Sequence, residues 1–182
     1  MLFRSDIACS NQLREGAGIG HAFGFIYNRI LPSGRVPMLP IMVNSFFPPN
    51  QPTPRRCYAL GRALREAIEA WDTDRRVAVI ASGGLSHTII DEELDWLLID
   101  SMREKNVDAL CSLPVDKLVR GTSEIRNWVV VAGAMEEMGS RASVLDYIPV
   151  HHGVTGLGWA YWDAAASALG RRTEATAGAA RA

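Results

Sequence analysis

The chain has 182 residues, of which 48% are hydrophobic and 21% charged, and its formal net charge is −1 at pH 7. This length suits one domain with a sizeable core, and the balanced charge gives no electrostatic reason to expect nucleic acid or an anionic membrane as a partner. No apolar run reaches the length of a membrane span, and the first residues lack the charged-then-apolar pattern of a signal peptide.

The three cysteines, Cys9, Cys57 and Cys111, are far apart and lie outside any CxxC pattern. An odd number of widely spaced cysteines favours reduced thiols over a disulfide framework or a zinc site. We therefore expect a cytoplasmic protein.

The first elements are a loop, an apolar segment and a strand. Gly16-Ala-Gly-Ile-Gly20 has G-x-G-x-G spacing and no preceding strand, so it is not a dinucleotide-binding fingerprint. Residues 22–31 are apolar and form either a short helix or a strand. Residues 36–43 are rich in β-branched and apolar side chains between turn signals, which predicts a buried strand, although Pro37 and Pro40 weaken its early part.

A proline-rich loop over residues 44–54 leads into a helix. Thr53 provides an N-cap and Pro54 a first helical residue, so we expect a helix to about Trp71. Its expected apolar face consists of Leu60, Leu64, Ile68 and Trp71. Residues 76–81 then predict a second buried strand, which Ser82-Gly-Gly84 ends sharply.

The second half of the chain alternates helices and strands. We expect a helix over residues 91–105, short helical turns within 107–118, and a helix over 124–138 that Thr122 or Ser123 caps. The middle of that last helix is apolar all round, which is typical of a buried helix. Residues 142–150 and 156–162 read as strands, and residues from about 164 onward as a disordered tail.

This order of elements predicts an α/β fold with a central, mostly parallel sheet covered by helices. Ligand sites of open α/β sheets lie beyond the carboxyl ends of the strands. His87 and the loop that begins at Asn44 both follow predicted strands. We therefore expect a site at that end of the sheet.

His87 lies in the loop Ser82-Gly-Gly-Leu-Ser-His87, where the glycines allow a tight turn and leave room beside the imidazole. Imidazoles are suited to proton transfer at physiological pH, although a histidine in such a loop also serves as a structural hydrogen-bonding group. Ser86 is not part of a G-x-S-x-G elbow, so serine nucleophile chemistry is not expected.

Glu124 opens the apolar helix. A glutamate there complements the helix dipole or takes part in capping. A carboxylate at the start of a buried helix is costly without a partner, however, and that partner is either Arg126 or a metal ion.

The other histidines give weaker signals. His21, in Gly20-His-Ala-Phe-Gly-Phe25, reads alone as a core or surface residue. His151 and His152 are adjacent on or after a strand, so they point to opposite faces and are not expected to share a metal. Two imidazoles and a carboxylate are nevertheless the ligand types of non-haem iron oxygenase sites.

Taken together, several segments resemble the class III extradiol ring-cleavage dioxygenases, in particular the catalytic B subunit of the protocatechuate 4,5-dioxygenase type. The likeness covers roughly residues 6–162. The segments that carry it are Asn11-Gln-Leu-Arg-Glu-Gly16, Gly20-His-Ala-Phe-Gly-Phe25, Pro40-Ile-Met-Val-Asn44, Pro52-Thr-Pro-Arg-Arg56, Ser82-Gly-Gly-Leu-Ser-His87 and Thr122-Ser-Glu-Ile-Arg-Asn-Trp128.

The resemblance implies Fe(II)- and O2-dependent opening of a catechol-type ring next to its hydroxyl-bearing carbons. By position, Glu124 resembles the carboxylate of the two-histidine, one-carboxylate triad. His87 resembles the acid/base histidine, and His21 its companion that deprotonates or orients the substrate. The resemblance also implies a homodimer or a small helical partner subunit.

The chain departs from the family in its histidines, because the family's two iron-binding histidines precede everything matched here. We therefore expect a C-terminal part of one B-subunit domain over residues 6–163, with a foreign start at 1–5 and a tail at 164–182. The Fe(II) ligands other than Glu124 are expected from the missing N-terminal region, so the chain is expected to be incomplete and inactive alone.

Two alternatives remain open. His21, His87 and Glu124 could form a complete metal triad within this chain, in which case their donor atoms should lie roughly 3 Å apart. The chain could also be a non-catalytic α/β binding or assembly module derived from the family. Arg56 and Arg126 are candidates for recognising a substrate carboxylate, with surface salt bridging as the alternative for each.

Overall fold

The computed structural model describes residues 15–31, 36–136 and 141–163. The contacts divide the chain into two compact units, Met1–Pro40 and Ile41–Ala182. The expected foreign start at residues 1–5 and the expected tail at 164–182 lie outside the described residues.

The first unit contains one described helix, α1 (His21–Arg29), so the helical alternative for residues 22–31 is confirmed. Gly20 is the N-cap residue and gives no side-chain cap, and no residue of α1 is buried. The Tyr27 hydroxyl donates a hydrogen bond to the Val36 carbonyl at 3.3 Å. This contact ties α1 to the extended segment that follows it.

The second unit begins with the proline-rich loop and helix α2 (Pro54–Ala70). Thr53 accepts a hydrogen bond from the Arg56 N–H at 3.3 Å and Pro54 occupies the first turn, as the sequence predicts. The expected buried face is rotated, however, because Cys57, Tyr58 and Gly61 are buried while Trp71 is 55% exposed.

Helices α3 (Glu92–Glu104) and α4 (Val107–Cys111) follow the sequence signals closely. Asp91 caps α3 by accepting from the Leu94 N–H, and Asn106 caps α4 by accepting from the Ala109 N–H, both at 3.0 Å. Each cap satisfies a backbone donor that has no partner inside the helix.

The buried helix is divided into a 3₁₀ segment, η1 (Arg120–Glu124), and α5 (Ile125–Ala134). The expected cap is wrong, because neither Thr122 nor Ser123 makes a side-chain cap for this helix. The Thr122 hydroxyl instead contacts the backbone of His87, and the Ser123 hydroxyl donates to the Arg120 carbonyl. Almost all of α5 is buried, as its apolar sequence predicts.

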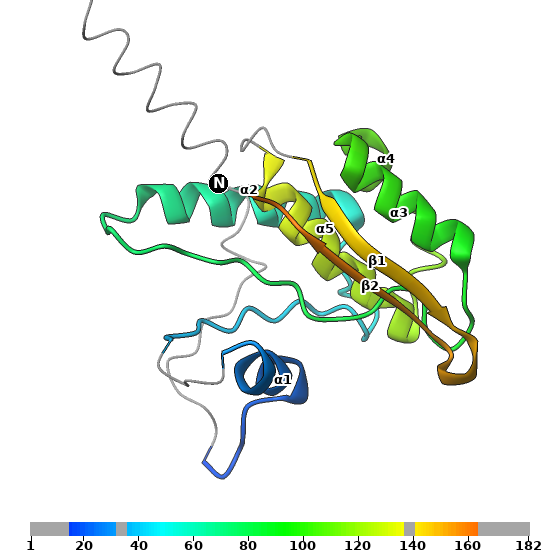
Figure 1. Cartoon of the computed structure of the whole chain (residues 1–182), viewed down its shortest axis with the longest axis horizontal. Coiled ribbons are helices and arrows are strands. Elements are labelled where there is room, and N and C mark those ends of the chain that lie inside the picture. Colours follow the sequence, from blue (N-terminus) through cyan, green and yellow to red (C-terminus); the bar gives the residue numbers. More distant parts are fainter. Residues whose placement is uncertain (1–14, 32–35, 137–140, 164–182) are drawn as a thin grey trace, which may run out of the picture. The chain divides into compact units, whose positions relative to one another are not determined.

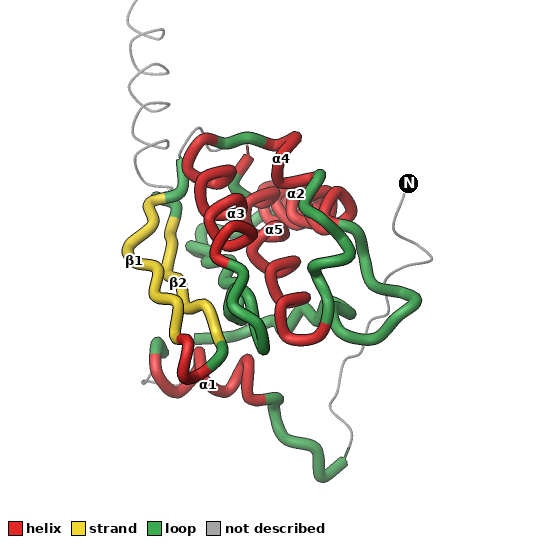
Figure 2. Tube along the Cα trace, turned by 90° about the vertical axis from the view of Figure 1, so that its right-hand side faces the viewer, coloured by secondary structure: helices red, strands yellow, loops and turns green. Residues whose placement is uncertain are grey.

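Strands β1 (Ser143–Val150) and β2 (Thr155–Tyr161) form an antiparallel hairpin joined by the 3₁₀ turn η3 (His151–Gly153). The ladder has a bulge between Val144 and Asp146. Figure 2 shows the two strands in yellow as one narrow ribbon, and α3 contacts β1. The sequence predicted both strands, but it did not predict that they pair with each other.

The predicted central parallel sheet is not present among the described residues, where the sheet has only these two antiparallel strands. Residues 36–43 and 76–81 have no helix or strand assignment. Leu39 and Met42 are each 83% exposed and Ile80 is 47% exposed. A segment rich in β-branched residues is suited to a pleated sheet. It forms a strand only where a neighbouring strand pairs with its N–H and C=O groups, and composition does not indicate whether such a strand is present.

The core lies where α2 crosses α5, with α3, α4 and the hairpin around them (Figure 1). Gly61 and Gly133 allow the two helices to approach closely. A Cβ on Gly61 would lie 2.0 Å from the Val130 carbonyl oxygen, and one on Gly133 would lie 2.2 Å from the Tyr58 carbonyl oxygen. Because Gly61 has no side chain, α5 packs directly against the backbone of α2 at this position, and the buried face of α2 is centred there.

None of the helices in the described ranges is both long enough and apolar enough to pass through a membrane.

Replacing Gly61 by Ala should lower the free energy of unfolding by about 2–3 kcal/mol, because the new methyl group meets backbone atoms that cannot move aside. The matched control is Gly24→Ala in α1, where a Cβ would meet nothing within 4 Å. That variant should be neutral or more stable by up to about 1 kcal/mol, since alanine favours helix. Denaturant titration measures both, and equal effects would contradict the close packing of α2 and α5.

Candidate active site

The loop Ser82–His87 is attached to the beginning of α5 by three hydrogen bonds. The Gly84 N–H donates to Glu124 Oε2 at 3.0 Å. The Asn127 amide and the Trp128 indole donate to the carbonyls of the two preceding loop residues, at 2.9 and 3.1 Å. Side chains from the end of η1 and the first turn of α5 thus fix three successive loop residues.

Glycines make this close approach possible. Gly83 has φ of +139°, which disfavours other residues, and a Cβ there would lie 2.9 Å from Glu124 Oε2. A Cβ on Gly84 would lie 2.5 Å from His87 Cε1, and one on Gly121 would lie 2.5 Å from His87 Cβ. The imidazole of His87 is therefore flanked by two residues that cannot carry a side chain without moving it.

The backbone of His87 is held on both sides. Its N–H donates to Thr122 Oγ1 at 2.9 Å, and the same hydroxyl donates to the His87 carbonyl at 3.2 Å. His87 also forms an isolated antiparallel bridge with Thr155 of β2. The loop is thus placed between the hairpin and η1.

The ring of His87 has a defined hydrogen-bonding partner. Nδ1 lies 2.8 Å from the Leu85 carbonyl oxygen. A carbonyl oxygen only accepts, so Nδ1 carries the proton in this contact. In the neutral ring Nε2 then keeps its lone pair and can accept a proton from another molecule.

His87 and Glu124, two of the three expected site residues, lie close together. His87 Nε2 lies 4.0 Å from Glu124 Oε2, and the two side chains are 25% and 38% exposed. Both groups are therefore within reach of a small molecule. His21, the third expected site residue, is exposed at the first position of α1 in the first unit.

The donor set does not fit Fe(II) on its own. Non-haem iron oxygenase sites use two histidines and one carboxylate. Among the described residues no group of three His, Cys, Asp or Glu side chains could hold a metal ion. The 4.0 Å between His87 and Glu124 also exceeds the roughly 3 Å that separates neighbouring donors on one small ion. One carboxylate and one imidazole amount to part of such a site.

The remaining sequence candidates have other positions. His151 and His152 are exposed in η3, and His151 Nε2 lies 3.6 Å from Glu92 Oε1. Ser86 is fully buried, in keeping with the expectation that it is no nucleophile. These residues are not part of the candidate site.

The predictions for Arg126 were wrong in two respects. It neither pairs with Glu124 nor forms a surface salt bridge. Its side chain is 1% exposed, and its guanidinium donates to the carbonyls of Pro52 and Leu118 at 2.7 and 2.8 Å. Burial lowers the pKa of this guanidinium. Arg126 therefore joins two loops to α5.

Sequence reasoning missed Asp95, which is fully buried in α3. Its Oδ1 accepts from the Ser86 N–H at 2.8 Å, and its Oδ2 accepts from the hydroxyls of Ser86 and Tyr147 at 2.7 and 2.8 Å. Burial raises the pKa of this carboxyl although the three hydrogen bonds act to lower it. Its position in line with Leu98 and Met102 on the apolar face of α3 was a signal that could have revealed it.

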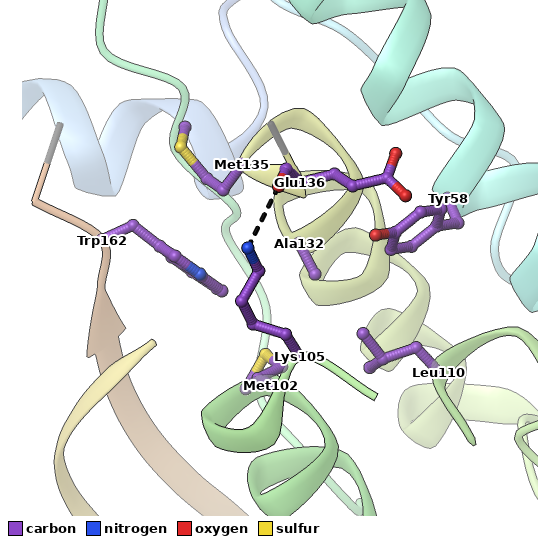
Figure 3. Close-up of a pocket in the computed structure, with 8 residues that line it drawn as sticks. All are labelled: Tyr58, Met102, Lys105, Leu110, Ala132, Met135, Glu136 and Trp162. Carbon is purple, nitrogen blue, oxygen red and sulfur yellow. Dashed lines mark hydrogen bonds between the residues drawn. The ribbon is translucent and has the colours of Figure 1, made fainter. Parts of the chain in front are cut away.

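A separate hollow lies at the opposite ends of α3 and α5 (Figure 3). Lys105, Tyr58 and Trp162 line it, and the Lys105 ammonium donates to the Glu136 carbonyl at 3.2 Å. His87 and Glu124 lie near the beginnings of those helices, so this hollow belongs to a different part of the molecule.

Comparison with known proteins decides the family. Residues 21–158 match the family model described as the catalytic LigB subunit of aromatic ring-opening dioxygenase. The chain belongs to this LigB family. The resemblance to ring-cleavage dioxygenases is therefore confirmed at the level of the family, while its protocatechuate-type branch is not singled out.

A curated relative of this LigB chain is gallate dioxygenase from Pseudomonas putida, which is 29% identical over 153 residues. The match covers 76% of this chain and 44% of the relative, so the chain spans less than half the length of that protein. No solved structure matches the chain.

Asp95→Asn tests the buried carboxyl through the pH dependence of stability. The folded-state pKa of Asp95 lies above the unfolded value near 3.8, so the folded chain keeps a proton that the unfolded chain has lost. Ionisation of Asp95 therefore reduces stability as pH rises from that value through the folded-state pKa.

Asparagine cannot ionise, so the stability difference between Asp95→Asn and the parent chain should shift in favour of the variant as pH rises above about 4. Urea titrations across this range measure the difference. Asp91→Asn is the comparison, because its carboxyl has a lowered pKa: its stability difference should shift in favour of the parent chain as pH rises toward about 4 and stay level above that pH. A pH-independent difference for Asp95→Asn would contradict the shift.

Proposed function

We propose that this chain contributes the proton-transfer histidine and one iron-binding carboxylate to an extradiol, ring-cleaving dioxygenase that acts on a catechol-type aromatic ring. The observation that carries the proposal is the pair formed by His87 Nε2 and Glu124 Oε2, 4.0 Å apart and partly exposed. Membership of the LigB family supports an oxidoreductase that uses an aromatic substrate and O2.

His87 acts as the acid/base group. Its Nδ1 is engaged by the Leu85 carbonyl, so Nε2 is the atom that takes a proton from a substrate hydroxyl and later returns it. Losing that proton makes a catechol a better ligand and a better reductant. Thr122 fixes the backbone of His87, and the flanking glycines leave room for its ring.

Glu124 is the proposed carboxylate ligand, and Fe(II) would supply the centre at which the two hydroxyls and O2 meet. The chain has four histidines in all. Two of them, His151 and His152, are exposed in η3, and His87 has the proton-transfer role. We therefore propose that the iron-binding histidines come from outside this chain; the companion role of His21 stays a prediction.

A non-catalytic assembly module is the second candidate. The observation that favours it is the exposed apolar surface of the second unit's extended segments, which includes Met42, Phe47 and Ile80. Apolar side chains exposed in succession favour association with a partner. That partner would be a second copy of the chain or a small helical subunit.

The test is reconstitution. The purified chain is given Fe(II) anaerobically, then gallate or protocatechuate and O2, alone or together with the part of the Pseudomonas putida gallate dioxygenase that the match does not cover. Iron content and O2 uptake are measured. For the chain alone we expect little retained iron and no O2 uptake, because a single carboxylate holds Fe(II) weakly. With the complementary part of the relative, we expect both iron retention and O2 uptake.

Variants assign the roles in the reconstituted protein. His87→Gln should retain iron and reduce O2 uptake about 10²- to 10⁴-fold, which is the usual contribution of an acid/base group. Glu124→Gln should lose iron, whereas His152→Gln, an exposed histidine away from the site, should change neither.

Stoichiometric iron with turnover by the chain alone would overturn the need for outside histidines. Full activity of His87→Gln would overturn its proton-transfer role. An iron-loaded assembly with a defined mass by light scattering but no O2 uptake would favour the assembly module instead.

A further inference from the structure

A single peptide group separates the buried carboxylate of Asp95 from the imidazole of His87. The N–H of the Leu85–Ser86 peptide donates to Asp95 Oδ1 at 2.8 Å. The C=O of the same peptide accepts from His87 Nδ1, also at 2.8 Å. The carboxylate, the peptide and the ring therefore form one continuous hydrogen-bonded array.

The middle of this array is closed to solvent. Asp95, Leu85 and Ser86 are each 0% exposed. Hydrogen bonds in series polarise one another, and they are stronger in a low-dielectric interior than in water. Water therefore does not compete for the peptide group, and its orientation is set by its protein partners.

The carboxylate itself has a fixed orientation. Its second oxygen, Oδ2, accepts from the hydroxyls of Ser86 and Tyr147. The Ser86 hydroxyl in turn accepts from the Asp91 N–H at 3.0 Å. The Leu85 N–H donates to the Gly156 carbonyl at 2.9 Å, so the preceding peptide, Gly84–Leu85, is held as well.

We propose that Asp95 is a positioning residue for His87 and acts through the Leu85–Ser86 peptide. It holds the Leu85 carbonyl against Nδ1–H, which selects the tautomer that leaves Nε2 unprotonated on the side of Glu124. The catalytic meaning of this selection rests on the proposed function, but the tautomer is a property of the chain itself.

The experiment is ¹⁵N NMR of the histidine rings in the full chain, without iron or substrate, at about pH 8.5, where histidines are neutral. The shifts distinguish a protonated from an unprotonated ring nitrogen. We expect His87 to have Nδ1 protonated and Nε2 unprotonated. A His87 that is mainly protonated at Nε2 would overturn the proposal.

Three variants distinguish a specific effect of Asp95 on the His87 ring from a general loss of stability of the fold. Asp95→Ala removes the acceptor of the Ser86 N–H. It should change the tautomer ratio of His87 about tenfold toward Nε2–H, which corresponds to the free energy of one lost hydrogen bond. Asp95→Asn keeps an acceptor oxygen and should restore most of the parent ratio. Tyr147→Phe removes a different partner of Asp95 and should leave the ratio unchanged while lowering stability.

An equal shift in Tyr147→Phe and Asp95→Ala would overturn the positioning role, as would an unchanged ratio in a folded Asp95→Ala. If Asp95→Ala does not fold, the hydrogen-bonded array can still be tested in the parent chain, by measuring NMR scalar couplings across its hydrogen bonds. These must connect the Ser86 amide to the Asp95 carboxyl and His87 Nδ1 to the Leu85 carbonyl, and their absence would contradict the array. All these readouts stand apart from ring cleavage, so a chain without dioxygenase activity can still satisfy them.

Discussion

The attachment of the Ser82–His87 loop to the start of α5 determines the geometry of the candidate site. Glu124 accepts a hydrogen bond from the loop, while Asn127 and Trp128 donate hydrogen bonds to it. The helix is itself fixed by its glycine-mediated contact with α2. The distance between His87 and Glu124 is therefore set by a packed core element, which is a firmer support than a loop alone can give.

Two buried ionisable side chains complete this support from different directions. Asp95 holds the loop through Ser86, and Arg126 joins α5 to the carbonyls of Pro52 and Leu118. A buried charge is costly unless hydrogen bonds replace the lost water, and each of these groups has at least two such bonds. The bonds to the Ser86 N–H and to the Pro52 and Leu118 carbonyls fix backbone segments that contain little regular structure. These residues therefore stabilise the loops around the site.

Local signals in the sequence were sufficient to place most of the helices. Thr53 and Asp91 cap their helices through neighbouring residues, so the sequence around them contains the necessary information. His87 and Glu124 were chosen because their segments resemble those of the ring-cleavage dioxygenases, and the structure places the two side chains 4.0 Å apart. The proton-transfer and iron-binding roles assigned to them remain predictions.

Properties that depend on distant partners were not predictable in the same way. The expected parallel sheet failed because strand composition does not reveal which strand supplies the hydrogen bonds. The buried position of Arg126 was not among the alternatives considered for it, because its carbonyl partners become neighbours only in the folded chain. Asp95 was missed for the same reason, since Tyr147 lies 52 positions along the chain. The apolar face of α3 contained a hint of its burial, but not of its partners.

The two glycines that flank His87 have a consequence for how such a site can vary. Because a methyl group at Gly84 or Gly121 would collide with the imidazole, the direction of the ring depends on two positions that contribute no functional group. Mutational tolerance at these positions should therefore be as narrow as at the histidine itself. A search that compares only polar residues between distant relatives would overlook them, although they determine where the reactive nitrogen points.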